Sequence, residues 1–208
     1  MRHPSLSVRA FAELMRLPAY EQTRILYDQK YPKSSPGAFK VPYYKPALGA
    51  IRTYYTKGND LAVLREAILD IQSGSNEPRA RNNERVVKAF RRSNQASRRL
   101  EVQSMPRVSD ILEGVELRLS PDLSAVEGSH HVRVFYNFRS APLDQDVARV
   151  VVELAHHVLG KHTVCKLSEF ELIDFAAGAV HCHRRPRKRT LMQATETAKV
   201  IQALWPTI

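Results

Sequence analysis

The spacing of apolar residues changes near residue 104, and this change constrains the fold more than any other feature of the chain. Before it, apolar residues recur every three or four positions, as in residues 61–72, which is typical of an amphipathic helix. After it, short runs such as residues 115–119 and 132–138 alternate or are rich in β-branched and aromatic residues, as strands are. The sequence therefore predicts an α+β protein.

We expect a helical N-terminal half, residues 1–104, followed by a mixed αβ half, residues 105–208, and the two halves could share one core. The second half should hold a small sheet of about four strands with two flanking helices. The expected strands are 115–119, 132–138, 169–175 and 178–184, and the expected helices around them are 143–160 and 190–205. The expected helices of the first half are 6–16, 18–30, 47–58, 61–72 and a long basic helix over 79–100.

Several helix ends carry capping residues. Asp144 suits the start of the helix over 143–160 and Gly160 its end, while Gly58 suits the end of an earlier helix. Thr190 is expected to cap the last helix.

The chain carries a formal net charge of +11, and the first half holds almost all of the excess. Residues 1–104 contain 19 Lys and Arg against 9 Asp and Glu, whereas residues 105–208 contain 13 against 12. A surplus of this size concentrates polyanions at the surface, so nucleic acid is the favoured partner. We expect no membrane association and no signal peptide, because no apolar run reaches the required length. Two cysteines suit a reducing cytoplasm.

Two basic segments are candidate phosphate-binding surfaces. In the long basic helix, four cations step by three or four positions along one face: Arg81, Arg85, Lys88 and Arg92. Five more lie between the last expected strand and the last helix: Arg184, Arg185, Arg187, Lys188 and Arg189. Cations so close together repel one another, an anion would relieve that repulsion, and arginine suits bidentate binding of phosphate. A merely solvated face is the alternative for both segments.

Tyrosines interleave with cations in the first half. Four of them could stack on unpaired bases, although a place in the core and rim of the helical half is the favoured interpretation: Tyr43, Tyr44, Tyr54 and Tyr55.

Residues 117–139 hold a Pro-Asp pair, Pro121-Asp122, followed by a β-rich run that ends in aromatics. This pair, together with the expected order of helix, strands, helix and strand, resembles the PD-(D/E)xK family of metal-dependent nucleases. In that family, carboxylates hold divalent ions that activate water and stabilise charge on the phosphate. The resemblance implies Asp122 as one catalytic acid, Glu116 or Glu113 as a second, and Mg²⁺ or Mn²⁺ as the cofactor.

The run after the Pro-Asp pair departs from the family pattern, because residues 131–139 contain no acid-x-lysine. The resemblance therefore implies a degenerate, nuclease-like fold without efficient catalysis. A plain turn, in which proline fixes φ and the aspartate bonds its own backbone, is the favoured interpretation of the pair. In either case we expect residues 117–139 to form a structural hairpin.

Histidines and cysteines fall in two groups that invite comparison with zinc sites: His156, His157, His162 and Cys165, then His181, Cys182 and His183. Neither group has the spacing of zinc ligands, and alternate residues of a strand point to opposite faces. We therefore expect no bound zinc and no other resident cofactor.

These observations favour a cytoplasmic nucleic-acid-binding protein, such as an accessory or targeting subunit of a mobile-element or defence system. The alternatives are a metal-dependent nuclease of the PD-(D/E)xK type and a protein-interaction module that binds an acidic partner. The absent acid-x-lysine separates the first two readings. The third differs because it predicts little salt-sensitive binding to DNA or RNA.

Overall fold

The structure, a computed structural model, describes residues 3–32, 43–105 and 107–208. The α-helices in these ranges are α1 (Val8–Leu14), α2 (Ala19–Lys30), α3 (Lys45–Thr56), α4 (Leu61–Gln72), α5 (Glu77–Arg92), α6 (Gln145–Gly160) and α7 (Lys188–Leu204). The strands are β1 (Ser5–Ser7), β2 (Glu101–Val102), β3 (Val108–Leu112), β4 (Val115–Leu119), β5 (Leu123–Glu127), β6 (His130–Asn137), β7 (Phe170–Asp174) and β8 (Ala179–Cys182). The α+β class expected from the sequence is confirmed.

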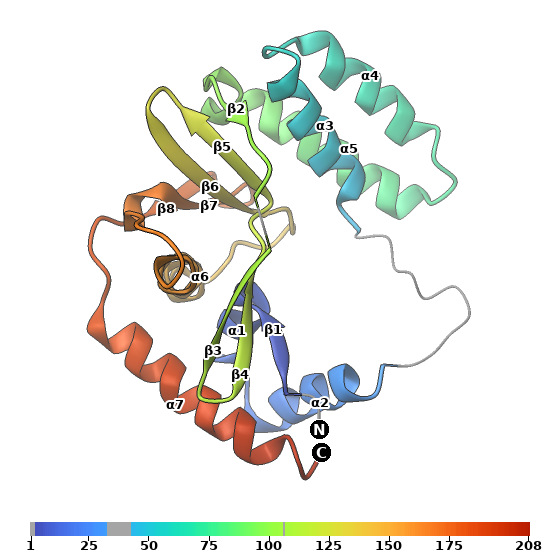
Figure 1. The fold of residues 1–208 in the computed structure, drawn as a ribbon. Coiled ribbons are helices and arrows are strands. Elements are labelled where there is room, and N and C mark those ends of the chain that lie inside the picture. The colour runs from blue at the N-terminus through green and yellow to red at the C-terminus, as the bar shows by residue number, and fades with distance from the viewer. Residues whose placement is uncertain (1–2, 33–42, 106) are drawn as a thin grey trace.

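A five-stranded mixed sheet with the order β2-β5-β6-β7-β8 carries the helical bundle of α3, α4 and α5 on one face and α6 on the other (Figure 1). Strand β6 shows why both faces can be covered. Its residues Val134 and Tyr136 point into the core beneath the bundle, while Phe135 between them joins the core around α6. The sheet is therefore buried on both sides, which suits its nearly continuous apolar strands.

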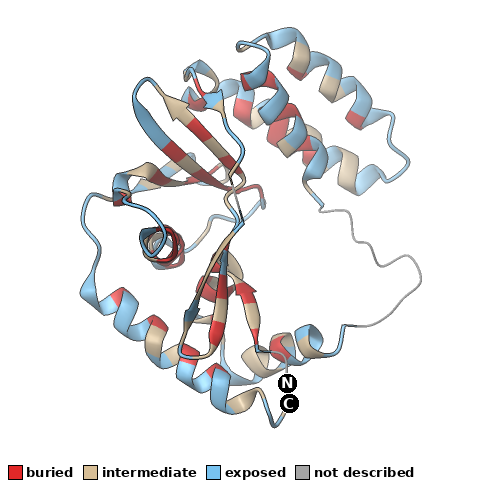
Figure 2. Ribbon diagram, in the orientation of Figure 1, coloured by how far each residue is buried: buried red, intermediate tan, exposed pale blue. Residues whose placement is uncertain are grey.

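A second, three-stranded sheet has the order β1-β4-β3. Strand β1 pairs with β4 in parallel, and Ser5 lies opposite Glu116. Residues of α1, α6 and α7 share one core with this sheet, and α6 is buried along much of its length (Figure 2). Helix α6 thus lies between the two sheets, and its N-terminus projects to the surface beside α1.

Both cores draw on residues from each side of residue 104. Leu6 and Phe11 of the first half pack with Val151 and Ala198, while Phe90 packs in the core that includes Leu123 of β5. The change of pattern in the sequence therefore marks a change in the type of secondary structure, and packing is continuous across it.

The segment expected as one hairpin is divided between the two sheets. Strand β4 belongs to the three-stranded sheet, and the hairpin is formed by β5 and β6, which pair from Leu123 opposite Val134 to Glu127 opposite His130. Pro121-Asp122 is the link between the sheets. The expectation of a single hairpin over 117–139 was wrong, because two short polar gaps, at Ser120 and at Gly128, each interrupt the strand pattern.

Helix ends agree with their predicted caps at three of four places. Asp144 caps α6 through the N–H groups of Asp146 and Val147, and α6 ends at Gly160. Gly58, with φ of +70°, follows the end of α3. Thr190 does not cap α7, which begins earlier at Lys188 and buries Thr190 within its first turn. Among the described residues, no helix combines the length and apolar character needed to cross a bilayer.

A candidate anion-binding site at the start of helices α6 and α7

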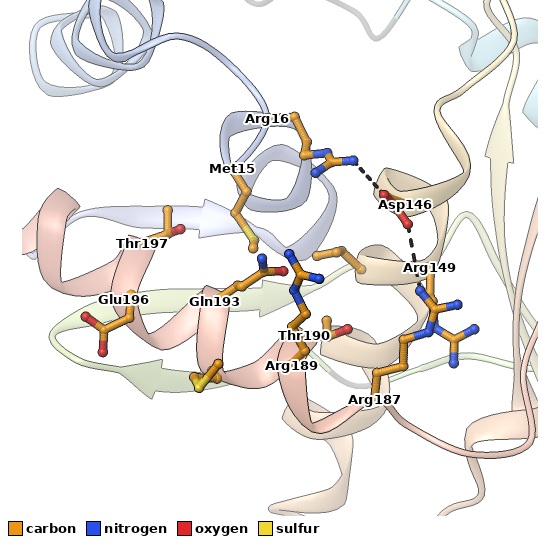
Figure 3. A pocket seen from close by; sticks show the side chains of 12 residues that line it. Met15, Arg16, Asp146, Arg149, Arg187, Arg189, Thr190, Gln193, Glu196 and Thr197 are labelled. Atoms are coloured by element: carbon orange, nitrogen blue, oxygen red, sulfur yellow. Dashed lines mark hydrogen bonds and ion pairs between the residues drawn. The ribbon is translucent and has the colours of Figure 1, made fainter.

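A cavity of about 640 Å³ lies where the first turns of α6 and α7 meet the residues that follow α1 (Figure 3). Four arginines line it: Arg16, Arg149, Arg187 and Arg189. Two carboxylates, Asp146 and Glu196, also reach its wall. The lining therefore carries an excess of positive charge that is drawn from three segments distant in sequence. We call this site the arginine cavity.

Arg149 is the most firmly held of the four. Its Nε donates to Glu153 Oε1 at 2.6 Å, one terminal nitrogen donates to the Arg185 carbonyl at 3.1 Å, and the other lies 3.3 Å from His183 Nδ1. Its side chain is 16% exposed and that of Glu153 is 3% exposed. A buried ion pair with several hydrogen bonds fixes the guanidinium in place.

Glu153 also ties the basic loop to α6. Its Oε1 accepts the backbone N–H of Arg187 at 3.2 Å, directly before α7 begins. Its other oxygen, Oε2, is buried and has no hydrogen-bond partner among the described residues, and the same holds for His183 Nε2. Burial, together with the Arg149 guanidinium, lowers the pKa of His183, so this imidazole is neutral near pH 7.

The remaining arginines are held more loosely. Arg16 donates to Asp146 at 2.7 Å, and Arg187 lies 3.8 Å from the same carboxylate. These side chains are 47–59% exposed, and such surface pairs contribute little free energy, so a stronger anion can compete for them. Arg189 has no hydrogen bond or ion pair to the part of the chain that the structure describes.

Helix α7 presents an open N-terminus to this cavity. Its N-cap, Arg187, makes no side-chain capping bond, and its first turn contains no acid. The free N–H groups of a 17-residue helix carry partial positive charge and favour an anion. Arg184, Arg185 and Lys188 are exposed around this end, so two of the five predicted loop cations line the cavity and three flank it.

The four cations predicted on α5 also lie together. Arg81, Arg85, Lys88 and Arg92 line a smaller cavity of about 360 Å³, which we call the α5 face. Three of them have protein partners. Arg81 pairs with Glu77, Lys88 lies 2.5 Å from Glu84, and Arg85 donates to the carbonyl of Phe138 at 2.6 Å.

The three acids implied by the nuclease resemblance lie in separate settings. Asp122 accepts the backbone N–H of Tyr136 at 2.7 Å, and burial raises its pKa. Glu116, on β4, accepts the hydroxyl of Ser5 at 2.5 Å, and this bond lowers its pKa. Glu113 is exposed in the turn between β3 and β4, with φ of +47°.

The histidines and cysteines bond mainly to backbone. His156 Nε2 lies 3.3 Å from the carbonyl of Cys165, and His162 Nε2 lies 2.9 Å from that of Ser109. Over the described ranges, no group of three or more His, Cys, Asp or Glu is arranged to hold a metal ion.

Two arginines of the cavity, Arg16 and Arg149, were not predicted from the sequence, and neither was Glu153, which holds Arg149. A signal was present, because Glu153 is the one acid in the apolar run of residues 147–155 and stands four positions after Arg149. Comparison of the chain with protein-family models, with curated proteins and with solved structures found no match.

Proposed function

We propose that the protein binds nucleic acid through the arginine cavity and serves as a non-catalytic accessory or targeting subunit. The observation that carries the proposal is the convergence of four guanidiniums on one cavity beside the open N-terminus of α7. The chemistry favours a phosphate. Arginine presents paired donors that match phosphate oxygens, and backbone N–H groups at a helix start add further donors.

The arrangement of the arginines also favours tight binding of phosphate. Arg149 is already ordered by Glu153, so an anion that it binds needs little further loss of side-chain entropy. Arg16 and Arg187 exchange a half-exposed carboxylate for phosphate, and Arg189 gains a partner. The exposed cations around the cavity, Arg184 and Lys188 among them, extend the attraction along a chain of phosphates.

The test is a titration of the purified protein into fluorescently labelled DNA and RNA over a range of salt concentrations. We expect affinity to fall steeply between about 50 and about 300 mM salt, and the double variant Arg187→Gln/Arg189→Gln to bind more weakly with a flatter slope. The matched control is Arg65→Gln, which removes an exposed arginine from α4. Two results would favour the protein-interaction alternative. One is an affinity for nucleic acid that does not change with salt, and the other is displacement of the nucleic acid by an acidic peptide of equal charge.

We further propose that binding does not lead to cleavage. Glu116 accepts a hydrogen bond from Ser5 of β1, whereas one carboxylate oxygen of Asp122 accepts the backbone N–H of Tyr136 in β6. No second-strand acid joins them, since the described part of β6 offers Arg133 and Asn137 instead. Incubation with linear and single-stranded DNA and RNA in Mg²⁺ or Mn²⁺ tests this. Cleavage that Asp122→Ala abolishes in a folded variant would restore the nuclease reading.

We place this activity in a reducing compartment such as the cytoplasm. Cys165 and Cys182 are free thiols, and burial raises the pKa of each. Thiols of this kind are stable where glutathione keeps cysteines reduced. Labelling of both cysteines by a thiol reagent in freshly lysed cells, after denaturation, would check the assignment.

A further inference from the structure

We propose that helix α2 carries a stacking platform for unpaired bases, formed by Tyr20, Tyr27 and Tyr31 with Arg24 among them. The ligand of this platform is single-stranded nucleic acid, and the inference rests on the nucleic-acid binding proposed above. We call these four residues the tyrosine stripe.

The stripe follows from helical geometry. Its members are spaced four, three and four residues apart, so at about 100° per residue they fall within an arc of roughly 60°. At about 1.5 Å per residue they extend over roughly 16 Å. The tyrosines are 71%, 53% and 49% exposed, and the rings of Tyr27 and Tyr31 lie with centroids 5.0 Å apart. Three large aromatic side chains are therefore exposed on one side of α2 and its C-cap, Tyr31.

This exposure does not come from a poorly anchored helix. The opposite side of α2 buries Leu26 completely. Gln22 donates to the carbonyls of Leu14 and Leu17, and Lys30 Nζ donates to the carbonyls of Trp205 and Ile208 at 2.6 Å. The helix is fixed along its length. The hydroxyls of Tyr20 and Tyr31 donate to Glu21 Oε1 at 2.9 Å and to the Ile208 carbonyl at 3.4 Å, and Lys30 Nζ lies 5.5 Å from the Tyr31 ring centroid, yet both tyrosines stay about half exposed or more.

The position of the stripe relative to the arginine cavity favours a polyanion with flat bases. Arg16 lines the cavity and precedes Tyr20 by four residues, so their backbones are at most about 14 Å apart. A strand whose phosphate occupies the cavity can reach the stripe within a few nucleotides. Arg24 then supplies a cation for the backbone, and the ring faces accept bases in any sequence.

The tyrosines singled out in the sequence are poorer candidates for base stacking. Tyr54 and Tyr55 are buried, and their hydroxyls donate to the carbonyls of Ala96 and Gln95. Tyr43 is 44% exposed, but its hydroxyl donates to the carbonyl of Pro78 and accepts from Asn82. Base stacking therefore belongs on α2 and not on the tyrosines that the sequence singled out.

The experiment compares a labelled single strand, the same strand with abasic sites, and a duplex of equal length. The triple variant Tyr20→Leu/Tyr27→Leu/Tyr31→Leu should lose roughly tenfold affinity per stacked base for the single strand, and change little for the duplex. Its salt slope should stay unchanged, because no charge is removed. The wild type should bind the abasic strand more weakly than the intact strand, and the triple variant should not distinguish them.

Two controls keep the result interpretable. The corresponding Tyr→Phe variant retains the ring faces and should bind as the wild type does, and Tyr43→Leu removes an exposed tyrosine elsewhere. Equal thermal unfolding temperatures of the variants exclude loss of fold.

The possible outcomes separate the two proposals. If the wild type binds no nucleic acid, both fall. If it binds and the triple leucine variant matches it on every ligand, only the platform falls. An equal loss on single strand and duplex also overturns stacking. So does a wild type that self-associates through the stripe, with a monomeric triple variant of undiminished affinity, because a second copy of the chain is then the occupant.

Discussion

The arginine cavity and the α5 face are both rich in cations in the sequence. They differ in how many of those cations the fold leaves able to bind an anion. On the α5 face, Arg85 is committed to the Phe138 carbonyl, while Arg81 and Lys88 pair with glutamates one turn away. In the arginine cavity, Arg149 is held by Glu153 with its guanidinium at the cavity wall, and Arg16 and Arg187 share the half-exposed carboxylate of Asp146. The number of cations in a segment thus says less about a binding surface than which carboxylates and carbonyls other segments bring to them.

The sharpest form of this comparison is between two glutamates that each pair with a cation four residues away. Glu153 is buried with Arg149, whereas the Lys88–Glu84 pair has side chains 50% and 20% exposed. We expect Glu153→Ala to lower the free energy of unfolding by about 3–5 kcal/mol, because it leaves a buried arginine uncompensated. Glu84→Ala should cost about 0.5 kcal/mol or less. Urea unfolding of both variants measures the difference.

Glu153→Gln provides the control for that prediction, since it keeps an acceptor for Arg149 and Arg187 while removing the charge. Its loss of stability should fall between the other two. Similar values for Glu153→Ala and Glu84→Ala would mean that the two pairs are equally solvated in solution.

The second prediction concerns binding. Arg187→Gln/Arg189→Gln should weaken nucleic-acid binding on the order of tenfold or more at about 50 mM salt, whereas Arg81→Gln/Arg92→Gln should have a much smaller effect. The loss of two phosphate contacts should reduce the slope of log affinity against log salt by about 1.8 on a duplex and about 1.4 on a single strand. Fluorescence anisotropy at four or more salt concentrations checks both values. Equal losses from the two double variants would erase the distinction between the surfaces.

The third prediction concerns Arg85 of the α5 face, which should contribute to stability and not to binding. Because its guanidinium donates to the carbonyl of the buried residue Phe138, Arg85→Ala should lower stability by about 1–2 kcal/mol. The salt slope of binding should stay the same. A flatter slope with unchanged unfolding temperature would show instead that Arg85 contacts phosphate.

The smallest effect is a dependence on pH. Burial and Arg149 lower the pKa of His183 below its usual value of 6.5, so just below that pH the unfolded chain binds more protons than the folded one. Stability should therefore fall as pH drops from about 7 to about 5, and His183→Gln should remove part of this fall. At the α5 face, the bond from Lys88 lowers the pKa of Glu84 from 4.5, so its contribution is lost only at lower pH. Thermal melts across this range compare the two.

Much of the fold could be predicted from local pattern. Helices with strong periodicity, such as α4, and strands with alternating apolar residues, such as β4, fall where the sequence places them. Strands β1, β2, β3 and β5 were missed. They are short, and the three residues of β1, for example, become a strand only by pairing with β4. Short segments of this kind have no periodicity of their own to read.

The candidate site was predictable only in part. The loop cations were visible as a dense run, and Arg187 and Arg189 do line the cavity. Arg16, near the other end of the chain, comes beside them because α1 packs on α6, a contact that no spacing in the sequence indicates. The site was hard to predict because its residues are far apart in the sequence, although their types are typical of anion binding.

The pairing of β1 with β4 and the packing of α1 on α6 also have a consequence during synthesis. The N-terminal elements must wait for partners that are synthesised much later. Phe11 and Leu14 pack in a core that includes α6, which ends at Gly160. At about 5–20 residues per second, a ribosome needs roughly 7–30 s to deliver that helix after α1 has emerged. Throughout this interval the apolar side of α1 is without its final partner. Until α6 emerges, the apolar side of α1 is open to a chaperone or to transient non-native contacts.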